Sequence, residues 1–362
     1  MNARTIPFLF IFILASYLLF ACQLAAPDEP SSTVSPPTST PTLTPEPGPL
    51  FTPAQTEPIF RRGTQPWFAD VVEPGAVIFQ DGQFHLFFNG FEGWPAKVAI
   101  GYATSPDGIT WTLAAPNPIL DSATETFDGY TFFASSALVE NDIWTLYLYT
   151  LAEGRDGAPG QIYRATAPTP AGDWTLDPTP LLTPGGEGTW DAVRVTDPSV
   201  IHTPDGYLMY YTGADTDRLQ AIRMIGLATS PDGITWTKHP YPALPLGEKG
   251  TWDAPRVFQP HVVQTPDGFW MLYKANIKVG QSEAFGLAYS HDGVAWERYA
   301  GNPIMVDKTY GLDWLRKGYA ELLFHEGKFY LYLEVLEREG GPYAHGNTDY
   351  LSNIVLLEWG GE

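Results

Sequence analysis

The sequence predicts an all-β protein whose strands form a five-bladed β-propeller. Two observations indicate this fold. A unit of about four strands recurs five times along the chain, and no window outside the first 20 residues shows an apolar stripe with helical spacing. Units of this kind bury their faces against neighbouring copies, so five of them predict a closed ring of blades.

The clearest part of the repeat is an alternating apolar strand, an Asp-Gly turn and a Trp that opens another strand. It occurs as IGYATSPDGITWT from Ile100, IGLATSPDGITWT from Ile225 and FGLAYSHDGVAWER from Phe285, with a degenerate copy, IYRATAPTPAGDWT, from Ile162. Alternation on both sides of an Asp-Gly turn is typical of a β-hairpin. A second pair of strands precedes each copy, as in AVIFQDGQFHLFFNG and SVIHTPDGYLMYYTG.

The innermost strand of each unit opens with a residue that recurs every 62 positions. Equal spacing predicts that these residues lie at equivalent positions and converge at one end of the propeller axis. The five residues are Glu73, Ser135, Asp197, Gln259 and Glu321.

The fifth unit ends with its third strand, within residues 353–360, and would leave a long exposed edge. The outer strands of the other units end in NPIL, TPLL, YPAL and NPIM, and the segment before the first unit contains the similar EPIF from Glu57. We therefore expect residues 51 to 61 to supply the outer strand of the last blade, so that an N-terminal strand closes the ring.

The first 50 residues are expected to lie outside the propeller. Residues 1–21 have one early charge, Arg4, and an apolar run too short for an ordinary membrane span, which predicts a signal peptide. The run ends in Leu-Phe-Ala-Cys, which resembles the lipobox of bacterial lipoproteins, so Cys22 is predicted to carry lipid. The alternative is cleavage near Ala21 that leaves Cys22, the single cysteine, as a free thiol.

Residues 22–50 are rich in Pro, Ser and Thr and predict a disordered linker, followed by a propeller domain at 51–362. This organisation predicts a lipid-anchored protein on the bacterial cell surface or on a membrane that faces the periplasm. We expect a monomer.

The composition excludes some classes of partner. A formal net charge of −21 argues against nucleic acid and against an anionic membrane surface, because both require a basic face. Polyanionic substrates are disfavoured for the same reason. The chain also has 12 Trp, 19 Tyr and 20 Phe, whose flat rings suit the apolar faces of sugars as well as core packing. Carbohydrate is therefore the predicted partner.

The five blades, the inner strand that opens with Asp197-Pro198 and the S-x-D-G-x-x-W turn together resemble the arabinanase, invertase and levansucrase group of glycoside hydrolases, with family 43 nearest. The resemblance covers roughly residues 57–360. The turn also resembles the Asp-box of six-bladed sialidases, so it supports the architecture more than the chemistry. In this group, three carboxylates from the inner strands of blades 1, 2 and 3 act as base or nucleophile, modulator and general acid.

The resemblance implies catalytic roles for Glu73, where Asp is usual, and for Asp197, where Glu is usual. Glu321 is a third predicted catalytic carboxylate. Ser135 stands where the modulating aspartate is expected, and we place it among the substrate-binding residues. The leading interpretation is a glycoside hydrolase that acts on oligo- or polysaccharide, for example a furanosidase. The alternatives are a non-catalytic carbohydrate-binding surface lipoprotein and a structural or protein-binding propeller. The sugar, the stereochemical outcome, and hydrolysis versus phosphorolysis stay open.

Several other polar and aromatic residues are predicted to bind substrate. Arg194 and Arg256, in WDAVRVTDP and WDAPRVFQP, lie just before axial residues and could hold a carboxylate or a sugar hydroxyl; a blade-to-blade salt bridge is the alternative. Gln259 lies on the axis. Trp94, on a loop with Gly and Pro, is a candidate sugar-stacking platform. His345 is either a binding residue, including a ligand of an axial ion such as Ca²⁺, or an ordinary loop residue.

No cofactor is predicted, because no His/Cys/Asp cluster has ligand spacing. The aspartates of the two Trp-Asp pairs, Asp191 and Asp253, are expected to fix their loops by accepting backbone N–H groups. Further residues expected at the rim of the site are Asp215, Arg218, Lys274, Tyr343 and Asp349.

Overall fold

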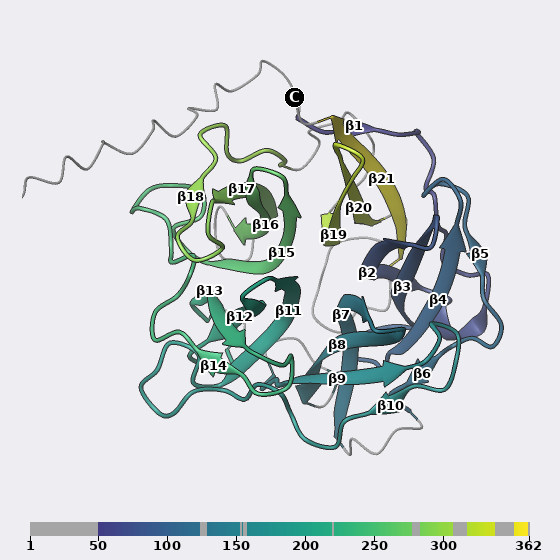
Figure 1. Ribbon diagram of the computed structural model, residues 1–362, viewed down its shortest axis with the longest axis horizontal. Coiled ribbons are helices and arrows are strands. Elements are labelled where there is room, and N and C mark those ends of the chain that lie inside the picture. The colour runs from purple at the N-terminus through teal and green to yellow at the C-terminus, as the bar shows by residue number, and fades with distance from the viewer. Residues whose placement is uncertain are drawn as a thin grey trace, which may run out of the picture. The chain divides into compact units, whose positions relative to one another are not determined.

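The computed structural model describes residues 50–123, 129–152, 154, 158–218, 221–276, 283–306, 317–336 and 351–360. Within these residues, five antiparallel sheets surround one axis, and each sheet is a blade (Figure 1). The prediction of a five-bladed, all-β propeller is confirmed. The one helical element described is a single 3₁₀ turn, η1 (Pro66–Phe68).

The blades follow one another in chain order, each with its first strand nearest the axis. Blade 1 contains β2 (Val71–Gln80), β3 (Gln83–Phe91), β4 (Ala99–Ser105) and β5 (Thr112–Leu113), with β6 (Leu120–Asp121) also paired to β4. Blade 2 contains β7 (Tyr130–Glu140), β8 (Ile143–Ala152), β9 (Ile162–Ala167) and β10 (Thr175–Leu176). Blade 3 contains β11 (Arg194–Thr203), β12 (Gly206–Ala214), β13 (Arg223–Ser230) and β14 (Thr237–Lys238).

The last two blades keep the same order. Blade 4 contains β15 (Val257–Thr265), β16 (Gly268–Asn276), β17 (Glu283–Ser290) and β18 (Glu297–Arg298). Blade 5 contains β19 (Lys317–His325), β20 (Lys328–Leu336) and β21 (Ser352–Gly360), and its outer strand is β1 (Thr52–Pro53).

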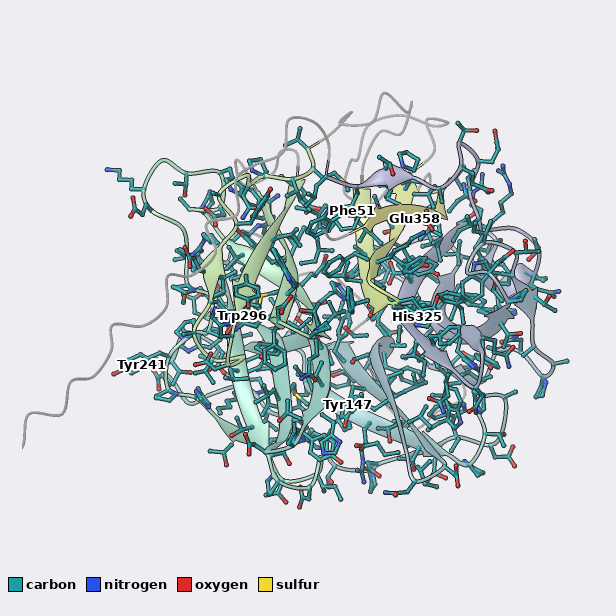
Figure 2. The ribbon with its side chains drawn as sticks, turned by 45° about the horizontal axis from the view of Figure 1, so that its top comes forward. Phe51, Tyr147, Tyr241, Trp296, His325 and Glu358 are labelled. Atoms are coloured by element: carbon teal, nitrogen blue, oxygen red, sulfur yellow. The ribbon has the colours of Figure 1, made fainter. Side chains whose placement is uncertain are left out.

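The N-terminal strand completes blade 5, as expected from the sequence. Thr52 pairs with Glu358 and Pro53 with Leu357, and Phe60 forms a further bridge to Ile354. Figure 2 shows Phe51 and Glu358 together at this edge. Phe51 is fully buried among residues of blades 4 and 5. The beginning and the end of the propeller are therefore fastened by both backbone pairing and apolar burial.

The repeated turn joins each of blades 1 to 4 to the blade before it. The Asp107 carboxylate accepts the N–H groups of Ile109 and Thr110, which lowers its pKa to about 2. This arrangement fixes the turn, whose Trp then packs on the second strand of the preceding blade. The pairs, with ring-centroid distances, are Trp111–Tyr332 (5.9 Å), Trp174–Phe87 (5.7 Å), Trp236–Tyr147 (6.5 Å) and Trp296–Tyr210 (5.4 Å).

A tyrosine occupies this second-strand position only where the following blade carries the full turn. The position holds a tyrosine before blades 3, 4 and 1, which have an Asp-Gly turn; these residues are Tyr147, Tyr210 and Tyr332. It holds Phe87 before blade 2, whose turn is degenerate, and Leu272 before blade 5, which has none. The hydroxyl of Tyr210 donates to the Gly293 carbonyl at 2.6 Å. The turn and the tyrosine thus form one contact between blades.

Part of the sequence-based organisation lies outside the described residues. This part includes Cys22, the predicted signal peptide and nearly all of the predicted linker. Among the residues that the structure describes, no helix is long and apolar enough to cross a membrane.

Removing the N-terminal strand is expected to destabilise the whole ring. A chain that begins at Gly63 loses Phe51 and Phe60, and burying one such side chain stabilises a fold by about 1.5–3 kcal/mol. Its melting temperature should fall by about 5 °C or more relative to a chain that begins at Leu50. Equal melting temperatures, measured by calorimetry, would show that the β1–β21 pairing contributes nothing to closure.

Removing one hydroxyl between blades 3 and 4 should have a smaller effect. Tyr210→Phe leaves the Gly293 carbonyl without this buried donor and should lower the free energy of unfolding by about 1 kcal/mol. The matched control is Tyr241→Phe, because Tyr241 is 79% exposed and points into solvent (Figure 2). Denaturant titration checks both variants, and an equally stable Tyr210→Phe protein would contradict the assigned contact.

Candidate active site

Each of the five axial strands contains a β-bulge near the same end of the axis. The register shifts lie between Pro74 and Ala76 in β2, Ala134 and Ser136 in β7, Thr196 and Ser199 in β11, Phe258 and His261 in β15, and Lys317 and Ala320 in β19. Bulges change the direction of side chains and are frequent beside active sites. This end of the axis is therefore the candidate active site.

The five evenly spaced axial residues do not lie at equal depth. Glu73 pairs with Asn89, just before the bulge, whereas Ser135, Asp197 and Gln259 are themselves bulge residues. Asp197 and Gln259 also share a left-handed backbone with φ of 52°, a conformation that Asp tolerates better than most residues. The expectation of five equivalent positions is therefore wrong in detail.

Glu321 departs most from the expected position. Its partner on the second strand is Tyr332, which is equivalent to Leu272, the partner of His261, and to Tyr210, the partner of Ser199. Glu321 therefore lies beyond the bulge, at the level of His261 and Ser199. The physical reason is that the hairpin turns that end the axial strands are not separated by a constant number of residues. Residues 62 positions apart therefore lie at different distances from their hairpins and pair with different positions of the second strand. The Oε2 atom of Glu321 lies 2.9 Å from Nδ1 of His261. Burial raises the pKa of Glu321, and His261 opposes this effect.

A layer of buried side chains lies on the second strands, next to the bulges. Each is the sixth residue after the first residue of its strand, so the set is equivalent by register. The five residues are Asn89, Tyr149, Thr212, Lys274 and Glu334.

Three side chains of this layer bind the bulge of the following blade. Asn89 donates to the Ala134 carbonyl at 3.0 Å and accepts the Ala134 N–H at 2.8 Å. Thr212 accepts the N–H of Gln259 at 2.8 Å, and Lys274 donates to the Gly318 carbonyl at 3.0 Å. Contacts across blade boundaries therefore set the positions of the axial residues.

Glu334 binds the bulge of its own blade. Its Oε2 atom accepts the N–H of Tyr319 at 2.9 Å. A Cβ atom on Gly318 would lie only 1.5 Å from the same oxygen, so glycine is required there for the carboxylate to fit.

Three carboxylates gather in this region: Glu73, Asp197 and Glu334. Glu73 is 1% exposed, and Asn89 donates to its Oε1 atom at 3.4 Å. Burial raises the pKa of Glu73 well above its usual range; the negative charges of Glu334 and Asp197 add to this effect, while Asn89 and Lys274 oppose it. Glu73 is therefore a carboxyl group that tends to hold its proton.

Two neighbours complete the surroundings of this cluster. Burial raises the pKa of the Tyr149 phenol, and the neighbouring Tyr319, Asp197 and Glu73 add to this effect. Asp197 accepts a hydrogen bond from the Thr196 hydroxyl at 2.9 Å. Glu73 and Asp197 thus have different hydrogen-bond donors, an amide and a hydroxyl.

The two predicted arginines are buried parts of the scaffold. Arg194 donates twice to the Ala158 carbonyl of blade 2, at 2.9 and 2.6 Å, so it links blades 2 and 3. Arg256 donates to Asn276 at 2.5 Å and lies over the ring of Phe258 at 5.2 Å. Lys274 lies 5.8 Å from that ring and forms an ion pair with Glu283 at 2.5 Å.

The remaining predicted binding residues are found in varied settings. Trp94 is half-buried against Phe91 and Phe133, with ring-centroid distances of 5.5 and 5.9 Å. Ser135 is buried in its bulge, and the Oε1 atom of Gln259 is buried without a hydrogen-bond partner among the described residues. His345, with Tyr343 and Asp349, lies outside the described residues. No group of three or more His, Cys, Asp or Glu residues in the described ranges could hold a metal ion.

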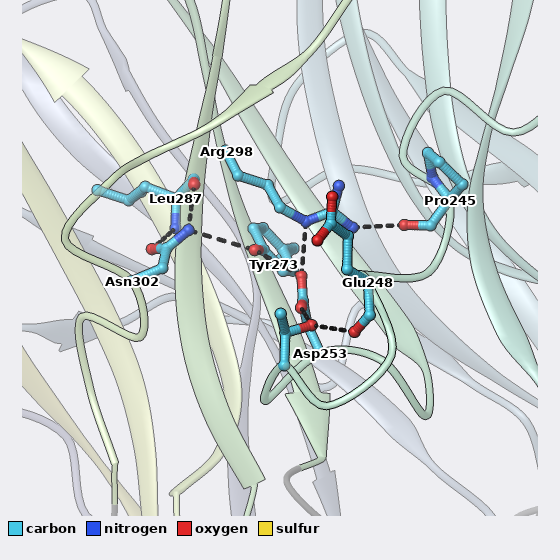
Figure 3. Close-up of polar contacts among 8 residues, drawn as sticks. Pro245, Glu248, Asp253, Tyr273, Leu287, Arg298 and Asn302 are labelled. Atoms are coloured by element: carbon cyan, nitrogen blue, oxygen red, sulfur yellow. Dashed lines mark hydrogen bonds and ion pairs between the residues drawn. The ribbon is translucent and has the colours of Figure 1, made fainter. Parts of the chain in front are cut away.

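Among the described residues, the aspartates of the Trp-Asp pairs accept hydrogen bonds from side chains, whereas backbone N–H groups were expected. Asp253 accepts from Arg298 at 2.6 Å and from Tyr273 at 3.2 Å (Figure 3). Asp191 accepts from Lys238 and Tyr211 in the equivalent way, at 2.5 and 3.2 Å. Both carboxylates fix the loop before an axial strand to the second and fourth strands of the same blade.

The sequence analysis missed Glu334 and Tyr149. A usable signal was present, because the second strands can be aligned on their hairpins. That alignment places a polar or phenolic residue at one position of FHLFFN, WTLYLY, YLMYYT, FWMLYK and FYLYLE.

Comparison with known proteins agrees with this architecture. One curated relative is an uncharacterized protein of Mycobacterium tuberculosis, MT1551, which is 29% identical over 170 residues, covering 44% of this chain and 54% of that protein. Another is the Arabidopsis thaliana beta-fructofuranosidase, insoluble isoenzyme CWINV6, which is 26% identical over 200 residues, covering 51% and 34%. A third is the probable sucrose-6-phosphate hydrolase of Psychromonas ingrahamii (26% over 215 residues, 54% and 36%). The chain spans about half the length of the first relative and about a third of the other two.

Solved structures share the fold at low identity. A glycoside hydrolase superimposes with a TM-score of 0.59 and 16% identity, covering 86% of this protein and 91% of the other. A thermostable family-43 glycoside hydrolase gives 0.58 and 16%, covering 81% and 90%. Residues 64–259, which include Glu73 and Asp197, match the N-terminal domain of glycosyl hydrolases family 32. This match spans more than half of the sequence, and the chain belongs to that family.

Proposed function

We propose that this protein hydrolyses glycosidic bonds with Glu73 and Asp197 as the two carboxyl groups that divide the acid and base roles. The observation that carries the assignment is the burial of Glu73 beside Glu334 and Asp197, which favours its protonated form. A glycosidase needs two carboxyl groups held in different protonation states by their surroundings. Asp197, which accepts a hydrogen bond from the Thr196 hydroxyl, is the second carboxyl group.

The proposed step uses one carboxyl group in each protonation state. One of the two acids donates its proton to the glycosidic oxygen as the bond to the anomeric carbon breaks, which releases the leaving group as an alcohol. The other, as a carboxylate, stabilises the positive charge that develops on the sugar ring. Water then adds to the anomeric carbon, and the proton it loses restores the acid.

The names of two relatives support a furanoside as the substrate. One is a beta-fructofuranosidase and one a probable sucrose-6-phosphate hydrolase. A fructofuranoside is therefore the first substrate to test. Aryl glycosides and oligosaccharides of other sugars complete the panel. A wild-type protein that binds sugars from this panel but releases no product would favour the non-catalytic alternative that Ser135 suggests.

Amide substitutions at the two acids should lower turnover far more than binding. Glu73→Gln and Asp197→Asn keep the shape and can still donate hydrogen bonds, but the amide can neither transfer a proton nor carry negative charge. We expect kcat to fall by about 10²–10⁴-fold for each, with KM changed much less. The control is Glu248→Gln, at an exposed loop position. Full activity in Asp197→Asn would rule out its proposed role.

Glu73→Gln should also change how stability depends on pH. The folded protein holds the Glu73 proton above the pH at which an unfolded chain releases it, so this carboxyl favours folding at acid pH and progressively less as the pH rises. Glutamine does not ionise. The melting temperature of Glu73→Gln relative to wild type should therefore rise between about pH 4 and pH 8. A constant difference across that range would contradict the raised pKa.

A further inference from the structure

We propose that Gln259 binds a hydroxyl group of the sugar on which Asp197 acts, through the amide at the end of its side chain. This inference rests on the proposed function and deepens it, because it adds a substrate-binding residue of blade 4 to the two carboxyl groups. Three observations carry it: the backbone conformation of Gln259, its connection to Asp197, and a buried amide oxygen that has no hydrogen-bond partner among the described residues.

Gln259 and Asp197 are presented at the site in the same way. Both are bulge residues of an axial strand, both precede a proline, and both have a φ of 52°. Their strands, β11 and β15, pack against each other on neighbouring blades (Figure 1). Because a bulge sets the direction of its side chains, matching bulges on adjacent strands direct the two side chains alike. The amide of Gln259 therefore follows the carboxyl group of Asp197 around the axis.

Two threonines that face each other in blade 3 connect these bulge residues. Thr196 pairs with Thr212 across β11 and β12. The Thr196 hydroxyl donates to Asp197 at 2.9 Å, and the Thr212 hydroxyl oxygen accepts the N–H of Gln259 at 2.8 Å. One pair of strands thus holds both the carboxyl group of Asp197 and the backbone of Gln259, which fixes the two residues relative to each other.

The backbone of Gln259 is costly to maintain. A positive φ is uncommon for residues other than glycine, and Asn and Asp adopt it more readily than Gln does. The proline that follows restricts the conformation further. Strained residues of this kind persist where the surrounding structure imposes them, and they are concentrated at functional sites. Backbone preference therefore does not explain a glutamine at this position, whereas a function of its amide does.

The amide oxygen of Gln259 lacks the partner that a buried polar group needs. Gln259 is 7% exposed, and its Oε1 atom is buried without a hydrogen-bond partner among the described residues. Glu73 and Asp197, by contrast, each accept a hydrogen bond from another side chain. Buried polar atoms without a partner are few in native proteins and reduce stability. A sugar supplies the partner, because a hydroxyl group can donate to the oxygen of an amide or accept from its nitrogen.

The competing explanation is a structural amide that needs no sugar, and the two explanations predict opposite effects on stability. Gln259→Met keeps the approximate volume of the side chain and removes the amide. Without sugar, its melting temperature should equal or exceed that of wild type, because an unpaired buried polar group has been replaced by an apolar one. A structural amide predicts a lower melting temperature. The matched control is Gln264→Met, the same substitution at an exposed position of β15.

The binding experiment follows the glutamine side-chain N–H signals of the full chain by NMR. The probes are D-fructose and sucrose, followed by the other sugars of the activity panel. The Gln259 signals are those missing from Gln259→Glu, whose side chain has nearly the same shape, and they should shift as sugar is added. Gln259→Met should bind the same sugar about tenfold more weakly, as expected for the loss of one hydrogen bond, and Gln264→Met should bind it as wild type does.

Monodeoxy forms of the bound sugar then identify the hydroxyl group. Wild type should bind one of them about tenfold more weakly than the parent sugar, whereas Gln259→Met should bind both equally, because the two changes remove the same hydrogen bond. The inference is overturned if no probe shifts the Gln259 signals, or if Gln259→Met melts well below wild type. Unchanged affinity in Gln259→Met, or undiminished discrimination against every deoxy form, overturns it as well.

These measurements need no turnover, so they are separate from the test of hydrolysis. A protein that binds sugar through Gln259 but releases no product refutes the proposed function and supports this inference. Hydrolysis with kcat and KM unchanged in Gln259→Met supports the proposed function and refutes this inference.

Discussion

The structure depends on the contact of each blade with the next, because a four-stranded blade cannot bury both of its faces alone. Two sets of contacts meet this requirement, and both run from a second strand to the following blade. On the outside, Tyr210 contacts the turn at Gly293 and the ring of Trp296. Near the axis, Asn89 binds the backbone of Ala134. The outer contact recurs at four of the five blade boundaries, and the last of these, Trp111 on Tyr332, joins blade 1 to blade 5.

The inner set of contacts also explains why the candidate site is so polar. A bulge frees backbone N–H and C=O groups from the ladder, and buried groups of this kind need partners. Side chains from the preceding blade supply them, as Thr212 does for Gln259 and Lys274 for Gly318. The same position in blade 5 carries an acid, Glu334, which accepts the Tyr319 N–H in the bulge of its own blade.

The sequence predicted what depends on local signals and missed what depends on register. The Asp-Gly turns and their tryptophans are local, so five blades and the closing strand could be predicted. The depth of an axial residue depends on where its strand is bulged and where its hairpin turns, and a shift of one residue changes which side chains meet. Glu321 was therefore grouped with Glu73, although the structure pairs it with His261. Glu334 was missed because the search for acids followed the first strands only.

The absence of a blade-2 aspartate is consistent with the charges that the site already contains. Glu73, Asp197 and Glu334 share a buried region in which Lys274 is the cation that acts on Glu73. A carboxylate at position 135, on a strand packed against β2, would add a further negative charge and make ionisation of the cluster still more costly. A neutral serine in blade 2 therefore avoids adding to the negative charge near Glu73.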